Sequence, residues 1–334
     1  MKTFFIGIDI SKKTFDCAFF LPGQLIFTGK YDNNTEGFKT MIKHLKSREI
    51  NINKAWFIME NTGDYTIQIA WFLEENNYTY SIVPAMRIKE TIVTQRGKND
   101  KVDAIRIAEY GQRFSDRLKP TQLADSKVFL LRKLMTERRL LTRDRASYMA
   151  ADKSDPRGVK QNINRRCQER IAFLEKQIEE IDKEMAEVIA MDELLAQNYE
   201  LLDSIKGIGL VNAVNIIVYT ENFTMFDNAR QYAAFCNVAP YEYTSGTSVR
   251  KGTHTSHKGH KQLKADLIMA ARSAIVHNPD LRLYYQRKVS EGKKRRLVLN
   301  NVAFKLITFM FAVIKRQTPY VYINNYSIKK SKTA

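Results

Sequence analysis

Short apolar runs alternate with amphipathic stretches over the first 120 residues of the chain. The runs FFIGID, DCAFF, LIFTG, AWFIME and TYSIV predict strands, whereas residues 37–46, residues 67–75 and the segment after Pro84 predict helices. Three strands in succession, followed by strands that alternate with helices, are typical of a mixed sheet with helices packed on it. We therefore expect an α/β domain over residues 1–122.

Residues 123–202 are predicted to form long helices. They contain little glycine and have one break, at the turn sequence SDPRG, residues 154–158. The second helix carries an apolar heptad seam at Ile171, Leu174, Ile178, Ile181, Met185 and Val188. Two arrangements fill such a seam: an antiparallel hairpin with the preceding helix of the same chain, or a coiled coil between protomers. The seam fixes the packing without saying whose helix fills it, so both stay open.

Residues 203–334 are predicted to be mainly helical. They begin with IKGIGLVNAVNIIV, in which Gly207 and Gly209 suit a helix-hairpin-helix turn whose backbone amides receive a phosphate. A glycine-capped turn between packed helices explains the same residues equally well. The apolar stretch Val302–Ile314 is interrupted by Lys305 and falls short of the roughly 20 residues that span a membrane, so we expect a buried helix there.

The composition points to a polyanionic partner. The chain has 54 Lys and Arg against 36 Asp and Glu, a formal net charge of +18, which favours nucleic acid over a membrane surface. The three cysteines are odd in number and far apart, which suits free thiols in a reducing cytoplasm. We expect a cytoplasmic, nucleoid-associated protein of a bacterium or archaeon, because the first apolar run meets an acid too early for an export signal.

Four acids stand where they can meet. Asp9 and Glu60 each end a predicted strand, and Asp100 and Asp103 lie three residues apart at the start of a predicted helix, on one face of it. Carboxylates about 4 Å apart repel by roughly 4 kcal/mol at an effective dielectric near 20, so such a cluster persists around bound cations. The four acids therefore predict a site for Mg²⁺, or Mn²⁺, that serves to cut nucleic acid.

A second candidate region follows Pro240, with the sequence YEYTSGTSVRKGTHTSHKGHKQLK, read as a loop that enters a helix. No acid lies between Glu242 and Asp266, and the five cations of the stretch are predicted to contact phosphates: Arg250, Lys251, Lys258, Lys261 and Lys264. A solvated basic loop is the alternative, but the packed hydroxyls, histidines and glycines favour a phosphate site.

Ser245, directly before a glycine, is the candidate nucleophile of this region, since glycine permits close approach to a phosphate and nearby cations stabilise charge. Chemistry alone does not choose it over Thr244, Thr247 or Ser248. His254, His257 and His260 recur at spacing three, but no cysteine or other usual fourth zinc ligand lies near. Phosphate contact or proton transfer is the favoured role for these histidines.

Five segments in this order and spacing resemble the DEDD transposases of the insertion-sequence-one-ten family, relatives of the Piv DNA invertases: GIDISKKTFD, MENTGDY, KNDKVDA, IKGIG, and YTSGTS with its HKGHKQLK continuation. The resemblance covers nearly the whole chain. It implies an RNase H-like (RuvC-like) domain in residues 1–122, with Asp9, Glu60, Asp100 and Asp103 as the DEDD tetrad. It further implies a helical coiled-coil region in residues 123–202 and a transposase domain in residues 203–334, with Ser245 as nucleophile.

By the same resemblance the protein is a DNA transposase or recombinase of an insertion sequence, acting on donor and target DNA. A structured non-coding guide RNA, and a homodimer that assembles to a tetramer on DNA, follow from the resemblance only. Where the family usually carries Asn-like and Arg residues, this chain has His260 and Lys264, and Lys lacks the bidentate fork of Arg. The alternatives are an invertase without guide RNA, a metal-dependent nuclease or junction resolvase, and a nucleic-acid-binding protein without catalysis.

Overall fold

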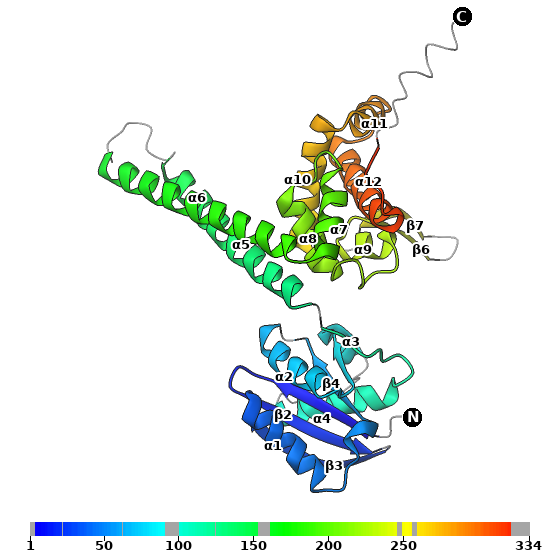
Figure 1. Ribbon diagram of the computed structural model, residues 1–334. Coiled ribbons are helices and arrows are strands. Elements are labelled where there is room, and N and C mark those ends of the chain that lie inside the picture. The colour runs from blue at the N-terminus through cyan, green and yellow to red at the C-terminus, as the bar shows by residue number, and fades with distance from the viewer. Residues whose placement is uncertain are drawn as a thin grey trace, which may run out of the picture. The chain divides into compact units, whose positions relative to one another are not determined.

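The chain forms two compact units, Met1–Leu123 and Ala124–Ala334 (Figure 1). The computed structural model describes residues 4–21, 23–61, 63–90, 100–123, 125–152, 161–245, 249–255 and 259–321. The backbone alone is described over residues 241–245 and 249–255 and at residues 64, 86, 89, 90, 152, 161 and 162. The division of the second unit into a helical region and a transposase domain stays a prediction.

The first unit is built on a five-stranded mixed sheet in the order β3-β2-β1-β4-β5. The strands are β1 (Phe4–Ile10), β2 (Thr14–Leu21), β3 (Gln24–Asp32), β4 (Ala55–Glu60) and β5 (Tyr80–Val83). The first three pair antiparallel, whereas β4 runs parallel to β1, and β5 parallel to β4. The predicted mixed sheet with packed helices is thereby confirmed.

Helices cover both faces of this sheet, as the alternation of side chains along β1 requires. Ile6, Ile8 and Ile10 lie in the core beneath α1 (Thr35–Lys46) and α2 (Asp64–Glu75), with the short 3-10 turn Ile52–Lys54 beside them. Phe5 lies in a second core, on the opposite face, under α3 (Ala85–Glu90) and α4 (Asp100–Arg113). Asp9 shares the face of Phe5, so its side chain lies on the α4 side of the sheet.

The second unit is mainly helical and has one continuous core. Its helices are α5 (Ser126–Asp152), α6 (Gln161–Ala190), α7 (Glu193–Asp203), α8 (Leu210–Thr220), α9 (Ala229–Phe235), α10 (Lys261–His277), α11 (Pro279–Ser290) and α12 (Arg295–Arg316). The core joins α8, α10 and α12 with the inner ends of α5 and α6, which extend from the other helices as an arm (Figure 1).

The heptad seam of α6 is filled by α5 of the same chain, as the first of the two arrangements expects. Ile181, Met185 and Val188 are buried in one core with Leu131 and Leu134 of α5. The predicted break at residues 154–158 lies outside the described residues. The prediction that this is the only break was wrong, because a second break separates α6 from α7. There Asp192 caps α7, and its carboxylate accepts a hydrogen bond from the Leu195 amide at 2.9 Å.

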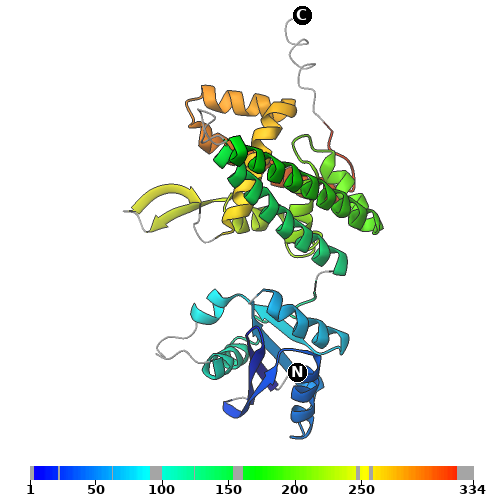
Figure 2. The same ribbon diagram turned by 90° about the vertical axis from the view of Figure 1, so that its left-hand side faces the viewer.

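The basic segment after Ala239 was expected to be a loop, and that prediction was wrong. It forms two antiparallel strands, β6 (Pro240–Ser245) and β7 (Val249–Thr255), which extend away from the helices (Figure 2). The strands were missed because hydroxyl and basic residues dominate the segment, although Tyr241 and Tyr243 alternate with polar residues in β6.

Among the described residues one helix, α12, has the length and apolar composition that would allow it to cross a membrane. Its residues Val302, Leu306 and Met310 are instead buried in the core of the second unit, and Lys305 interrupts its apolar surface. The predicted buried helix is thus confirmed. The three cysteines are buried free thiols, also as predicted.

Candidate active site

The pairing of strands brings Asp9 beside Glu60. β1 and β4 run parallel with Ile8 opposite Met59, so Asp9 and Glu60 each stand one residue further along, at the same end of the sheet. Both side chains lie on the α4 face, since Phe5 of β1 and Ile58 of β4 are in the core beneath α4. Two of the four predicted acids therefore lie close together by backbone register.

Close packing of α4 against β1 brings in the other two acids. A methyl group added at Gly7 would overlap the backbone of α4, at the Ala104 carbonyl and the Ala108 amide, so only glycine lets the helix lie this near the strand. Gly7 is two residues before Asp9 on the same face, and Ala104 directly follows Asp103. The first turn of α4, which carries Asp100 and Asp103, thus lies over the end of β1.

The pKa of Asp9 reports this convergence. Burial raises the pKa of Asp9 to about 6, and the negative charges of Asp103, Asp100 and Glu60, in that order, contribute further. A smaller contribution comes from Asp16. The four acids that the sequence singled out are therefore electrostatic neighbours in the folded unit, and a cation among them would relieve their repulsion.

The carboxylates do not form a closed cage. Across the described part of the chain, no group of three or more His, Cys, Asp or Glu side chains is arranged so that it could hold a metal ion. Asp103 has a partner of its own: its Oδ1 accepts a hydrogen bond from the Arg106 guanidinium at 2.8 Å. The donor set, all carboxylate oxygen, still fits Mg²⁺ or Mn²⁺, provided that Asp103 turns from Arg106.

A fifth carboxylate, Asp16, was missed by the sequence analysis. It lies directly opposite Asp9 in the β1–β2 pair and opposite Lys30 in the β2–β3 pair. Its side chain is only 14% exposed and lies 3.6 Å from the Lys30 ammonium. The sequence does contain this information, because pairing the two strands outward from the turn between them sets Asp9 opposite Asp16. The pairing can be read only once the register of the hairpin is known.

The candidate nucleophile lies in the second unit. Ser245 is the last residue of β6, and its backbone pairs with Val249 at the far end of the β6–β7 hairpin. Thr244 is in the same strand, whereas Thr247 and Ser248 lie outside the described residues. The role of Ser245 therefore stays a prediction.

The five predicted phosphate-binding cations have different surroundings. Arg250 and Lys251 are in β7, where the backbone alone is described, and Lys258 lies outside the described residues. Lys261 is exposed in the first turn of α10. Lys264 instead donates a hydrogen bond to the Asn237 carbonyl at 2.9 Å, and burial together with Arg296 lowers its pKa. This contact gives Lys264 a structural role beside the predicted one.

In the turn before α8, the first glycine, Gly207, allows close packing against α10. Gly207 has a φ of +104°, and a methyl group there would lie 2.6 Å from the Ala274 Cα of α10. Gly209 has open space around it and is the N-cap of α8. The packed-turn alternative accounts for Gly207, and phosphate binding at this turn stays a prediction.

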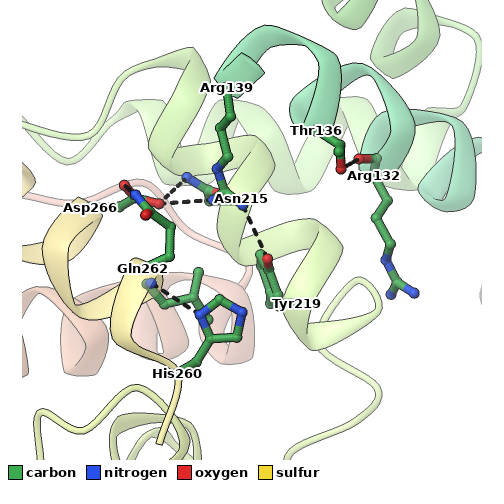
Figure 3. Close-up of polar contacts among 9 residues, drawn as sticks. Arg132, Thr136, Arg139, Asn215, Tyr219, His260, Gln262 and Asp266 are labelled. Carbon is green, nitrogen blue, oxygen red and sulfur yellow. Dashed lines mark hydrogen bonds and ion pairs between the residues drawn. The ribbon is translucent and has the colours of Figure 1, made fainter. Parts of the chain in front are cut away.

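A polar cluster fastens the start of α10 to the arm (Figure 3). Arg139 of α5 donates hydrogen bonds to Asp266 of α10 at 2.9 Å, to Asn215 of α8 at 2.5 Å and to the Tyr219 hydroxyl at 3.1 Å. His260 packs edge-on against Tyr219, with ring centroids 5.0 Å apart, and its Nδ1 accepts a hydrogen bond from the Leu263 amide. The arm, α8 and the start of α10 are thereby held together.

Two transposase profiles match the chain. The DEDD profile of IS110, described as "Transposase", matches residues 6–150, and the profile described as "Transposase IS116/IS110/IS902 family" matches residues 199–286. The "Pilin gene-inverting protein" of Moraxella bovis is 26% identical over 325 residues, which cover 96% of this chain and 98% of that protein. An uncharacterised 43.6 kDa protein of insertion element IS110 from Streptomyces coelicolor is 31% identical over 36% of this chain and 29% of its own length.

These matches first define a class, the transposases and DNA invertases, so the chain is a DNA recombinase enzyme. Within that class it belongs to the IS116/IS110/IS902 family of transposases. The resemblance found in the sequence is thereby confirmed.

Proposed function

We propose that this recombinase cuts and rejoins donor and target DNA with two groups of residues: a metal-binding DEDD tetrad and the nucleophile Ser245. The observation that carries the proposal is the geometry that brings the four acids together: Asp9 and Glu60 end paired parallel strands, and α4 packs on β1 at Gly7. Burial, and then the charges of Asp103, Asp100 and Glu60, raise the pKa of Asp9 to about 6. The strand order β3-β2-β1-β4-β5, antiparallel then parallel, supports the assignment of the first unit to the RNase H-like (RuvC-like) fold.

Asp9, Glu60, Asp100 and Asp103 would hold Mg²⁺ or Mn²⁺, which when bound supplies Lewis-acid polarisation of a phosphate. The chain's own part is to keep these carboxylates near one another on β1, β4 and α4. Calorimetry of Mg²⁺ binding tests this directly. Asp9→Ala should abolish the binding, and the matched variant Asp116→Ala, an exposed acid beyond α4, should leave it unchanged. If both variants bound Mg²⁺ equally well, the four acids would have a structural role only.

In the proposed reaction the Ser245 hydroxyl attacks a DNA phosphate. A bond from phosphorus to the serine oxygen forms as the bond to the leaving sugar oxygen breaks, and the serine proton ends on that leaving oxygen. The phosphoserine link conserves the bond energy, so that the reverse step on another strand end rejoins DNA. Cations of β7 and α10 would neutralise the phosphates beside it.

Covalent trapping distinguishes this reaction from hydrolysis by a junction resolvase. Wild-type protein incubated with a nicked suicide substrate should give a protein–DNA adduct, and Ser245→Ala should give none while still binding DNA. Thr244→Ala, one residue earlier in the same strand, is the matched control and should retain the adduct. An adduct formed by Ser245→Ala would refute the serine mechanism.

An invertase is the second candidate, because the match to the pilin gene-inverting protein extends over 96% of this chain. The guide RNA and the assembly of homodimers into a tetramer are proposals carried by the family alone. Purifying the protein and sequencing any discrete RNA bound to it separates a guided transposase from an unguided invertase. Sedimentation of the protein with and without DNA measures the assembly.

A further inference from the structure

Two adjoining hollows lie along α11 and α12. One of about 780 Å³ is lined by these helices and the segment Thr318–Val321, and one of about 400 Å³ is lined by α12 and residues 238–240. Tyr284, Thr308 and Phe309 line both hollows, so the two form one groove, which we call the α11–α12 groove. A space of this size accommodates planar organic groups instead of water alone.

Aromatic rings form the centre of the groove. Tyr284 and Phe309 are half-buried, and the Phe309 ring lies 5.0 Å from the ring of Tyr320. Cations lie over the Tyr284 ring, with the Lys305 ammonium 4.6 Å and the Arg287 guanidinium 5.9 Å from the ring centroid. Half-buried rings close to cations suit a ligand in which flat bases alternate with negative charges.

The charges of the groove have one dominant sign. Arg230, Arg287, Lys305 and Arg316 line it, and Asp280 is the single carboxylate among its lining residues. Within the described residues, Arg230, Lys305 and Arg316 have no carboxylate within ion-pair distance, and Arg287 is 3.8 Å from Glu291. This excess of cations is complementary to a phosphate backbone.

We propose that the α11–α12 groove binds a segment of single-stranded DNA, with unpaired bases against Tyr284 and Phe309 and phosphates at the flanking cations. The inference rests on the recombinase function, because exchange of strands leaves DNA unpaired. Bases inside a duplex cannot enter such a hollow, whereas unpaired bases present their faces to aromatic side chains. The groove therefore distinguishes unpaired strands from duplex DNA.

Binding of three DNA probes to the full chain tests the proposal: oligothymidylate, an abasic oligonucleotide of the same length, and a duplex. Tyr284→Leu and Phe309→Leu keep apolar packing but remove the ring, and each should weaken oligothymidylate binding about tenfold without changing abasic or duplex binding. Arg287→Gln and Arg316→Gln should weaken binding of both single strands and reduce its salt dependence. Lys288→Gln, on the same helix but paired with Glu291 at 2.6 Å, is the matched control and should change nothing.

Photocrosslinking locates the contact. Oligonucleotides carrying 5-iododeoxyuridine should crosslink to peptides from α11 and α12, and Ser245→Ala should crosslink like wild type, which separates this inference from the serine mechanism. Crosslinks confined to other segments would overturn the proposal. It would equally be overturned by variants that bind oligothymidylate like wild type, or by tighter binding of the matching RNA strand. The exposed arginine variants keep the test informative if an aromatic variant melts early.

Discussion

Replacing Gly7 with alanine should disable the acidic site without touching any acid. The added methyl group would lie 2.9 Å from the Ala108 Cα and closer still to the Ala104 carbonyl and the Ala108 amide, all of them backbone atoms of α4. Ordinary contact begins at 3.4 Å, so α4 must move by roughly 1 Å, and Asp100 and Asp103 move with it.

The magnitude follows from two separate effects. Overpacking at a helix–sheet contact of this kind costs about 1–3 kcal/mol of stability, which leaves a folded unit that melts several degrees lower. A displacement of about 1 Å at a catalytic constellation lowers activity on the order of 10²-fold. The recombination defect should therefore be much larger than the loss of stability explains.

The assay pairs recombination of a reporter plasmid with thermal melting and with Mg²⁺ calorimetry. Gly111→Ala is the matched control, since it adds a methyl group to the same helix, but one that meets side-chain atoms of Ile58, Cδ1 at 2.5 Å and Cγ1 at 2.9 Å, instead of the backbone. It should melt a few degrees lower and recombine normally. Wild-type Mg²⁺ affinity and recombination in Gly7→Ala would refute the claim that α4 positions the site.

Two further predictions concern the polar cluster around Arg139. Arg139→Met should lower the free energy of unfolding in urea by about 1.5–3 kcal/mol, because Asp266 loses its charged partner. The double variant with Asp266→Leu should recover part of this loss. If it recovers nothing, the two residues are not coupled. Burial, and to a lesser extent the charge of Arg139, lowers the pKa of His260 from its ordinary value of 6.5. The unfolded chain therefore binds more protons at this histidine than the folded chain does. The free energy of unfolding should fall as the pH drops through 6.5. His260→Asn keeps the cap of α10 without titrating, so it should flatten this part of the melting profile; an unchanged slope would contradict the assignment.

The acids could be found from sequence because each follows a strong local pattern. Asp9 and Glu60 end apolar runs that became β1 and β4, and the spacing of Asp100 and Asp103 survives in α4. Their convergence also requires long-range information, the parallel register of β1 with β4 and the approach of α4 at Gly7. No local periodicity reports a contact between a strand and a helix almost 100 residues later in the chain.

The serine region was harder to predict for a different reason. Strand β7 carries hydroxyl and basic residues without an apolar face, so the pattern that finds half-buried strands fails there. In β6 the alternation of Tyr241 and Tyr243 was a strand signal that was missed. Asp192 illustrates a third limit. Apolar spacing continues past it at Leu194 and Leu195, and only its role as a cap marks the end of α6.

The two groups of residues proposed for catalysis are held in place by different means. The acids depend on backbone packing, since α4 touches β1 where glycine alone fits, so their positions change only if the helix moves. The serine lies at the end of a hairpin whose first strand directly follows the core residues Val238 and Ala239, and His260, near the start of α10, packs on Tyr219, which Arg139 of the arm contacts. We therefore expect a displacement of the arm to affect the proposed serine reaction more than the acids, which belong to the other unit.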